Sequence, residues 1–145
     1  MLGRLARYLR FFGHDTEYAR GLTDAAIADR SRSEGRRLLT RDRHLARQIA
    51  GAILIASPSL PDQLRQVEAA VPEAGYQVSF VRCTLCNGLL RPWSLPEGAV
   101  WPEEIPVAVE GSSRPVFECS RCGHRYWEGS HTEHIRRQVA GWLPG

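Results

Sequence analysis

Hydrophobic residues in the first 75 positions alternate between helical and strand spacing. Apolar side chains recur every three or four residues from 2 to 12, which predicts an amphipathic helix ending at Gly13. Further helices are expected at 24–34, 43–50 and 60–70. Short strands are expected at 14–18, 37–40 and 51–56. This alternation predicts an α/β domain over residues 1–75, with a parallel sheet flanked by helices.

The second part of the chain, residues 76–145, has shorter and less regular patterns. Strands are expected at 78–81, 116–118 and 125–127. The stretch between 87 and 115 is rich in proline and has no helical period, which favours a loop or a loose β-arm. Apolar residues at helical spacing over 133–142 predict a terminal helix.

All four cysteines of the chain occur in two close pairs, Cys83-x-x-Cys86 and Cys119-x-x-Cys122. One such pair can place both thiolates on one metal, and two pairs complete a tetrahedral zinc site. The alternatives are two disulfides or a thioredoxin-like redox pair, which would stand early in a βαβ unit. Four thiolates leave no open coordination position, so the expected zinc is structural. The sequence therefore predicts a small zinc ribbon with a C-terminal helix over residues 76–145.

Composition and charge limit the kinds of function that the protein can have. No apolar run in the 145 residues approaches the ~20 needed to span a bilayer, so we expect no membrane segment. Metal thiolates are favoured in reducing compartments, which predicts a cytoplasmic protein. All 19 basic residues are arginine, and residues 1–80 carry the net positive charge. Guanidinium groups bind phosphates in bidentate fashion, so this bias permits nucleic-acid binding.

Two carboxylates are candidates for catalysis. Asp42 follows the expected strand 37–40, and ligands of open parallel sheets bind beyond the carboxyl ends of strands. The same aspartate is equally suited to cap the next helix, and both interpretations stay open. Asp24 stands in a first helical turn, where the dipole favours any acid. With Arg41 and Arg43 nearby, the two acids suggest a phosphodiester site that uses magnesium or manganese.

Aromatic residues after the second cysteine pair allow two interpretations. Trp127 and His131 can pack the ribbon against the rest of the protein. Alternatively, they present a stacking and hydrogen-bonding surface to RNA. His131 could also act as a proton shuttle near the acids.

Several segments together resemble a known family. They are Met1–Arg10, Leu39–Asp42, the first cysteine pair with Asn87-Gly88, and the second pair followed by Tyr126-Trp127-x-Gly129-Ser130-His131. The chain resembles, over essentially its whole length, the Mut-seven C-terminal RNase domain family of PIN-like ribonucleases fused to a zinc ribbon. The resemblance implies a PIN-like fold, metal-dependent RNA cleavage in the cytoplasm, and active-site acids at Asp24 and Asp42.

One departure from the family bears on catalysis. Members typically begin with a short apolar strand ending in a metal-binding aspartate, just ahead of the segment matching Met1-Leu2-Gly3. Nothing precedes Met1 in this sequence, so we expect a truncated start and impaired cleavage. The alternatives to an active ribonuclease are therefore a noncatalytic RNA- or protein-binding module and a catalytically impaired fragment. A protein partner or a homo-oligomer is compatible with each.

Overall fold

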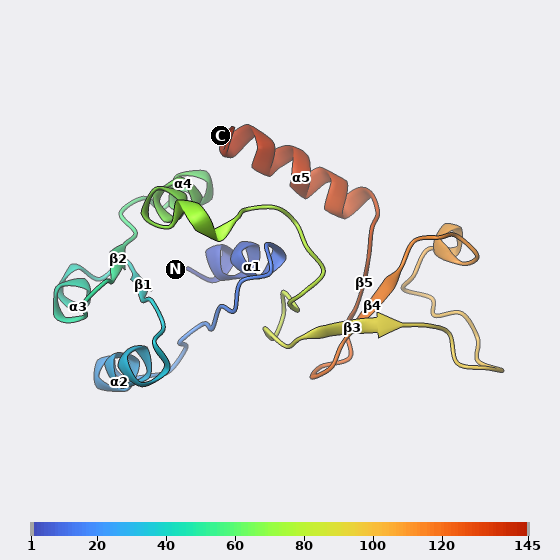
Figure 1. The fold of residues 1–145 in the computed structure, drawn as a ribbon, viewed down its shortest axis with the longest axis horizontal. Helices are drawn as coiled ribbons and strands as arrows, with labels where there is room; N and C mark the ends of the chain where they lie inside the picture. The colour runs from blue at the N-terminus through green and yellow to red at the C-terminus, as the bar shows by residue number, and fades with distance from the viewer. Residues whose placement is uncertain (1, 145) are drawn as a thin grey trace.

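The computed structural model describes residues 2–144, which form a mixed α/β molecule (Figure 1). The α-helices are α1 (Gly3–Phe11), α2 (Asp24–Glu34), α3 (Arg43–Gln48), α4 (Leu60–Ala70) and α5 (Ser130–Trp142). The strands are β1 (Leu39–Thr40), β2 (Ile53–Leu54), β3 (Leu90–Trp93), β4 (Val116–Cys119) and β5 (Arg125–Trp127). Two 3-10 turns, η1 (Pro72–Ala74) and η2 (Val107–Val109), complete the described elements.

The strands form two small sheets. β1 and β2 pair in parallel, with Leu39 opposite Ile53. The other sheet is antiparallel in the order β3-β4-β5, with Leu90 opposite Cys119 at one end. The α/β class is thus confirmed, with a parallel pair in the first part and an antiparallel ribbon in the second. The PIN-like arrangement stays a prediction.

Two of the strand predictions were wrong. Residues 14–18 and 78–81 belong to no strand of the structure. A strand needs a neighbour to pair with, and the backbone of the first segment bonds to side chains instead. The Thr16 N–H donates to Asn87 Oδ1 at 3.0 Å, and its carbonyl accepts from Arg10 at 2.8 Å. The alternating residue types in 14–18 therefore did not lead to a strand, because the segment has no neighbouring strand within residues 2–144 to pair with.

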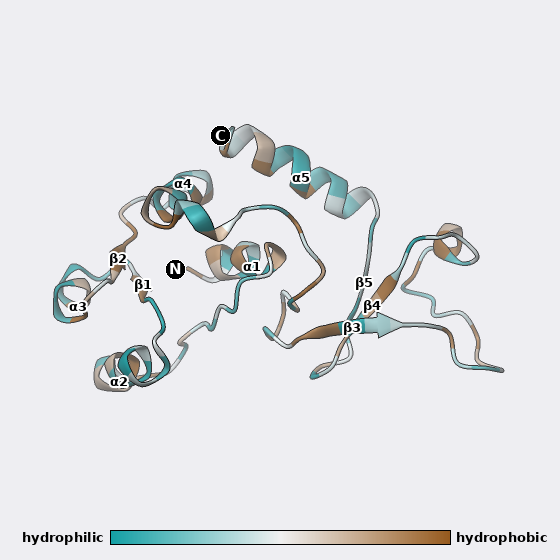
Figure 2. Ribbon diagram, viewed as in Figure 1, coloured by the Kyte–Doolittle hydropathy of each residue, from teal (hydrophilic) through white to brown (hydrophobic). Residues whose placement is uncertain are grey.

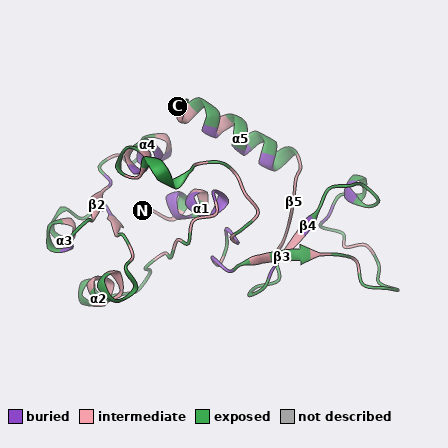
Figure 3. Ribbon diagram, in the orientation of Figure 1, coloured by how far each residue is buried: buried purple, intermediate pink, exposed green. Residues whose placement is uncertain are grey.

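The main core joins α1, α4 and α5. Leu5, Leu64 and Ile135 are each at most 3 % exposed and belong to one hydrophobic cluster. The buried face of each helix points towards this cluster (Figure 3). Because α5 lies near the end of the chain, residues of both predicted domains contribute to one core. The division of the chain into two domains, at residues 75 and 76, stays a prediction.

Both ends of α2 are capped. Thr23 Oγ1 accepts the N–H of Ala26, and Gly35 ends α2 in the left-handed conformation with φ 64°. α5 begins at Ser130, three residues before the expected start. Figure 2 shows that α5 is largely hydrophilic, as expected for a helix with only one buried face. Within residues 2–144, no helix combines the length and apolar character needed to cross a membrane.

Candidate functional site

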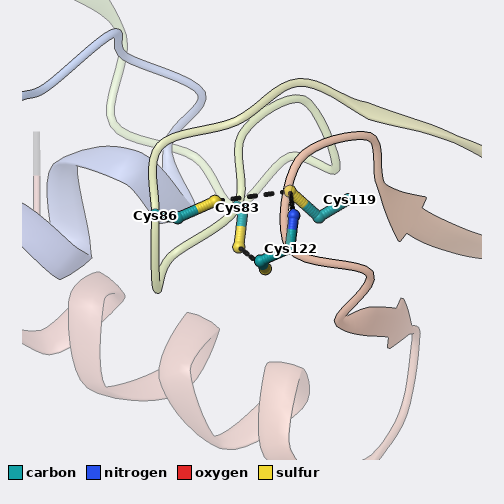
Figure 4. A group of neighbouring side chains, drawn as sticks. All are labelled: Cys83, Cys86, Cys119 and Cys122. Atoms are coloured by element: carbon teal, nitrogen blue, oxygen red, sulfur yellow. Dashed lines mark hydrogen bonds between the residues drawn. The ribbon is translucent and has the colours of Figure 1, made fainter.

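The four cysteines converge on one point between the turn after residue 82 and the β4–β5 turn (Figure 4). Their Sγ atoms all lie within 4.8 Å of one another. Cys83 is 3.6 Å from Cys122, and Cys86 is 3.4 Å from Cys119, measured between Sγ atoms. Tetrahedral zinc with bonds of about 2.3 Å holds its sulfur ligands about 3.8 Å apart. The cluster is therefore the size of a single ion site, and four cysteines this close could hold a metal such as zinc.

The two cysteine turns have matching backbone geometry. Cys83 N–H donates to the Gly88 carbonyl, and Cys119 N–H donates to the His124 carbonyl, both at 2.8 Å. Asn87 adopts a left-handed conformation with φ 69°, which asparagine tolerates better than most residues. A Cβ atom at Gly88 would lie 2.8 Å from the Cys119 Sγ. Glycine at this position therefore lets the two turns approach each other across the sulfur cluster.

The thiols differ in acidity because their surroundings differ. Burial alone would raise the pKa of Cys119, but the N–H groups of Cys122 and Arg121 lower it to about 7. These two groups lie 3.4 and 3.3 Å from its sulfur. The His124 N–H favours the Cys122 thiolate, but burial and the other three cysteines raise its pKa to about 12. Four thiolates this close need a cation to stay ionised together, which fits a metal centre.

Tyr126 supports the cluster from β5. Its hydroxyl lies 3.1 Å from the Cys83 Sγ and accepts the Thr84 N–H at 3.1 Å. Burial and the neighbouring Cys83 raise the pKa of Tyr126 to about 12, so this side chain stays a hydrogen-bond donor. The tyrosine thus orients one ligand of the site from outside.

Arg10 connects the first cysteine turn to α1. The side chain is 8 % exposed, and its guanidinium donates to the carbonyls of Thr84, Leu85 and Thr16 at 3.1, 3.3 and 2.8 Å. Burial lowers the pKa of Arg10, and the nearby Cys83 and other acidic groups offset part of that effect. The cation therefore stabilises the turn through backbone oxygens.

Asp42 has the capping role that the sequence left open. Its Oδ1 accepts the N–H groups of His44 and Leu45 at 2.8 and 3.1 Å, at the start of α3. It also lines a cavity of about 1200 Å³ between α1, α2 and β1. Arg41 lines the same cavity and donates to the Ser57 carbonyl at 3.3 Å. An exposed carboxylate beside an arginine is thus present at the end of β1.

Asp24 stands apart from that cavity. It is exposed on the first turn of α2 and is not among the residues that line the cavity. Within residues 2–144, the cysteine cluster is the only group of three or more ligand-type side chains close enough to share a metal. Convergence of Asp24 and Asp42 on one metal site, with Arg43 beside them on α3, stays a prediction.

A network of ion pairs on the cavity wall was not anticipated from the sequence. Arg36 pairs with Asp15 at 3.0 Å and with Glu17 at 3.2 Å, and Arg30 pairs with Glu17 at 2.5 Å. The amide of Asn87 and the guanidinium of Arg36 lower the pKa of Asp15. The positions of Asp15 and Glu17 could have indicated this network, because residues two apart in an extended segment lie on the same side of it.

Trp127 and His131 lie in different environments. Trp127 packs against the small cluster of Ile105, Val109 and Val116 near the ribbon. His131 is exposed, and its ring centroid is 6.2 Å from that of Phe11 on α1. The tryptophan thus packs within the second part of the chain and not against the first part, while the histidine lines a cleft beside α1. A role of either residue in RNA binding stays a prediction.

The sequence profile of the family described as the Mut7-C RNAse domain matches residues 1–139 of the chain. The chain belongs to this family. Membership in Mut7-C implies a ribonuclease-type role with RNA as the substrate class, in agreement with the resemblance drawn from the sequence. Comparison with curated proteins and with solved structures found no significant match.

Proposed function

We propose that this Mut7-C chain is a metal-dependent ribonuclease that hydrolyses RNA phosphodiester bonds and carries a structural zinc ribbon. The family match over residues 1–139 is the observation that carries this proposal. Zinc is assigned to the four cysteines because their number, charge and spacing suit a closed tetrahedral site.

In the proposed reaction, Asp42 and Asp24 would hold magnesium or manganese through their carboxylate oxygens. An ion bound there would supply Lewis acidity to the phosphoryl group and would acidify water. Arg41 and Arg43 flank Asp42 in the chain and bind the phosphates on either side of the cleaved bond. Asp42 already uses one oxygen as the α3 cap, so its other oxygen serves the ion.

Asp42→Asn tests the catalytic role without removing the cap. Asparagine is as good an N-cap as aspartate, so α3 stays formed while the charge is lost. We expect slow cleavage of a labelled single-stranded RNA by the chain in Mg²⁺ or Mn²⁺, and none by Asp42→Asn. Two carboxylates hold divalent ions weakly, so millimolar metal is needed.

Asp29→Asn is the matched control, because Asp29 is an exposed acid of α2 that pairs only with Arg32. It should cleave at the wild-type rate, whereas Asp24→Asn should not cleave. Zinc content is measured in every reaction, so that loss of the ribbon is not mistaken for loss of catalysis. Equal cleavage by wild type and Asp42→Asn would rule out the assigned site.

RNA binding without cleavage is the second candidate function. It is favoured by the absence, within residues 2–144, of a carboxylate cluster large enough to hold a metal by itself. In that case the RNA binds in the same assay with or without divalent metal, and no product forms.

A further inference from the structure

A cleft of about 210 Å³ lies between α1 and α5, apart from the cavity at Asp42. Arg4 and Arg7 line it from α1, and His131 and His134 line it from α5. All four side chains are exposed. Figure 1 shows the two helices as neighbours although they lie at opposite ends of the chain. The cleft therefore exists only in the folded protein.

Helical spacing aims these side chains at one another. Arg4 and Arg7 are three residues apart on α1, and His131 and His134 are three residues apart on α5. Side chains three apart lie on one face of a helix, with Cβ atoms about 5–6 Å from each other. Each wall thus presents a pair of nitrogen donors to the same space.

The charge of the cleft is not neutralised by the protein. No acidic side chain lines it. Neither Arg4 nor Arg7 forms a salt bridge with a carboxylate of residues 2–144, whereas Arg136 on α5 pairs with Glu128. Two guanidinium groups that share a concave surface with no acid attract anions and raise their local concentration. Arginine forks match the oxygens of a phosphate.

The floor of the cleft is rigid. Phe11 is 8 % exposed and packs its ring edge-on against Tyr8 with centroids 5.8 Å apart. The Tyr8 hydroxyl donates to Gln138 Oε1 at 3.3 Å, which bridges α1 to α5. The His131 ring is held against Phe11 at 6.2 Å. The floor is therefore formed before a ligand binds, and the cost of ordering falls on the four exposed side chains.

We propose that this cleft binds the phosphate backbone of RNA through Arg4, Arg7, His131 and His134. The geometry indicates an anion, and the choice of RNA as that anion rests on the proposed function. The volume corresponds to roughly seven water molecules, which suits a phosphate and part of its sugar. The cleft holds the strand in place and takes no part in bond cleavage.

Binding is measured by fluorescence anisotropy with a labelled 12-nucleotide oligouridine, without divalent metal, over a range of salt concentrations. Each phosphate contact with a single strand contributes about 0.7 to the slope of log K against log salt. Arg4→Gln/Arg7→Gln should therefore lower the slope by about 1.4 and weaken binding at 0.1 M salt by about 25-fold. Arg4→Lys/Arg7→Lys should keep the slope and lose only part of the affinity, because lysine keeps the charge without the fork.

Arg32→Gln is the control for loss of positive charge away from the cleft, since it removes one of the two charges that the double variant removes, from an arginine side chain that is 68 % exposed on α2. It should bind RNA like the wild type. His134→Ala removes a nitrogen donor from the α5 wall and should give a second, independent loss of affinity. Unchanged affinity in both the double variant and His134→Ala would overturn the cleft, even if the chain binds RNA elsewhere. Absence of binding by the wild type would also overturn it. Cleavage assays on Asp42→Asn report on the proposed catalysis separately.

Discussion

The three arginines of α1 have different environments although they follow one another at three-residue intervals. Each step of three residues rotates a side chain by about 300°, so Arg10 points about 120° away from Arg4. In the structure Arg4 and Arg7 line the α1–α5 cleft, and Arg10 is buried against the first cysteine turn. Because three residues fall short of a full helical turn, Arg10 points into the protein and stabilises the fold, while Arg4 and Arg7 remain on the surface and can bind anions.

Arg10→Met is expected to destabilise the protein by about 2–4 kcal/mol, because the buried carbonyl of Thr84 and the partly buried carbonyl of Leu85 lose their donor. Methionine retains much of the length and apolar stem, so the change reports mainly on the hydrogen bonds. Urea unfolding followed by circular dichroism measures the difference. Arg7→Met on the exposed face should stay within about 0.5 kcal/mol of the wild type. A similar midpoint for both variants would show that the Arg10 bonds contribute little.

Asp15 gives a prediction for acid stability. Its folded pKa is depressed below the ordinary value of 3.8 by the Asn87 amide and Arg36. A depressed pKa contributes stability that is complete above the unfolded value and is lost as pH falls through the folded value. The wild type should therefore be more stable than Asp15→Asn at pH 7, and the gap should narrow as pH falls below about 4. Urea midpoints measured from pH 2 to 7 test this, and a gap that stays constant below pH of about 4 would contradict it.

At the scale of elements, local signals were sufficient for helices and insufficient for strands. Caps at Thr23 and Gly35 mark both ends of α2, and Asp42 marks the start of α3, because a cap acts on residues close in sequence. α3 ends at Gln48, two residues before the expected end. Strands depend on partners that are distant in the chain. Segment 14–18 has alternating residues, yet the Thr16 backbone bonds to the side chains of Asn87 and Arg10 and not to another strand. The cysteine spacing did predict a long-range contact. Two pairs that bind one ion must lie next to each other in the fold, however far apart they are in the sequence.

The close approach of the two cysteine turns gives an element-scale prediction. In Gly88→Ala, the new methyl would lie 2.8 Å from the Cys119 sulfur and 2.9 Å from the Arg121 Cβ. The turns must move apart, so bound zinc per chain should fall well below one, measured by elemental analysis. Gly141→Ala is the control in α5, where nothing lies within 4 Å of the added Cβ. It should keep its zinc and gain up to about 1 kcal/mol, since alanine is the better helix former.

At the scale of the whole molecule, the ribbon and the helical core share elements. α5 follows β5 directly and packs Ile135 and Val139 against α1 and α4. Asn87 contributes a second link, because its amide donates to the Asp15 carboxylate at 2.7 Å. The cysteine cluster therefore lies at the junction of the chain's two parts. If the cluster holds zinc, loss of the metal should affect residues far from the sulfur atoms.

Cys119→Ser and zinc removal are the tests of that coupling. Structural zinc couples binding to folding, so Cys119→Ser should lose the metal and unfold β3, β4 and β5. Hydrogen exchange should also speed up in segment 14–17 and at the end of α1, where Asn87 and Arg10 make their bonds. α4 should keep most of its protection, because Leu60, Leu64 and Val67 are buried in the core with α1. Wild type stripped by a chelator should show the same pattern and recover when zinc is added, whereas the variant should not. Faster exchange confined to the ribbon would mean that Arg10 and Asn87 hold the turn without depending on the metal.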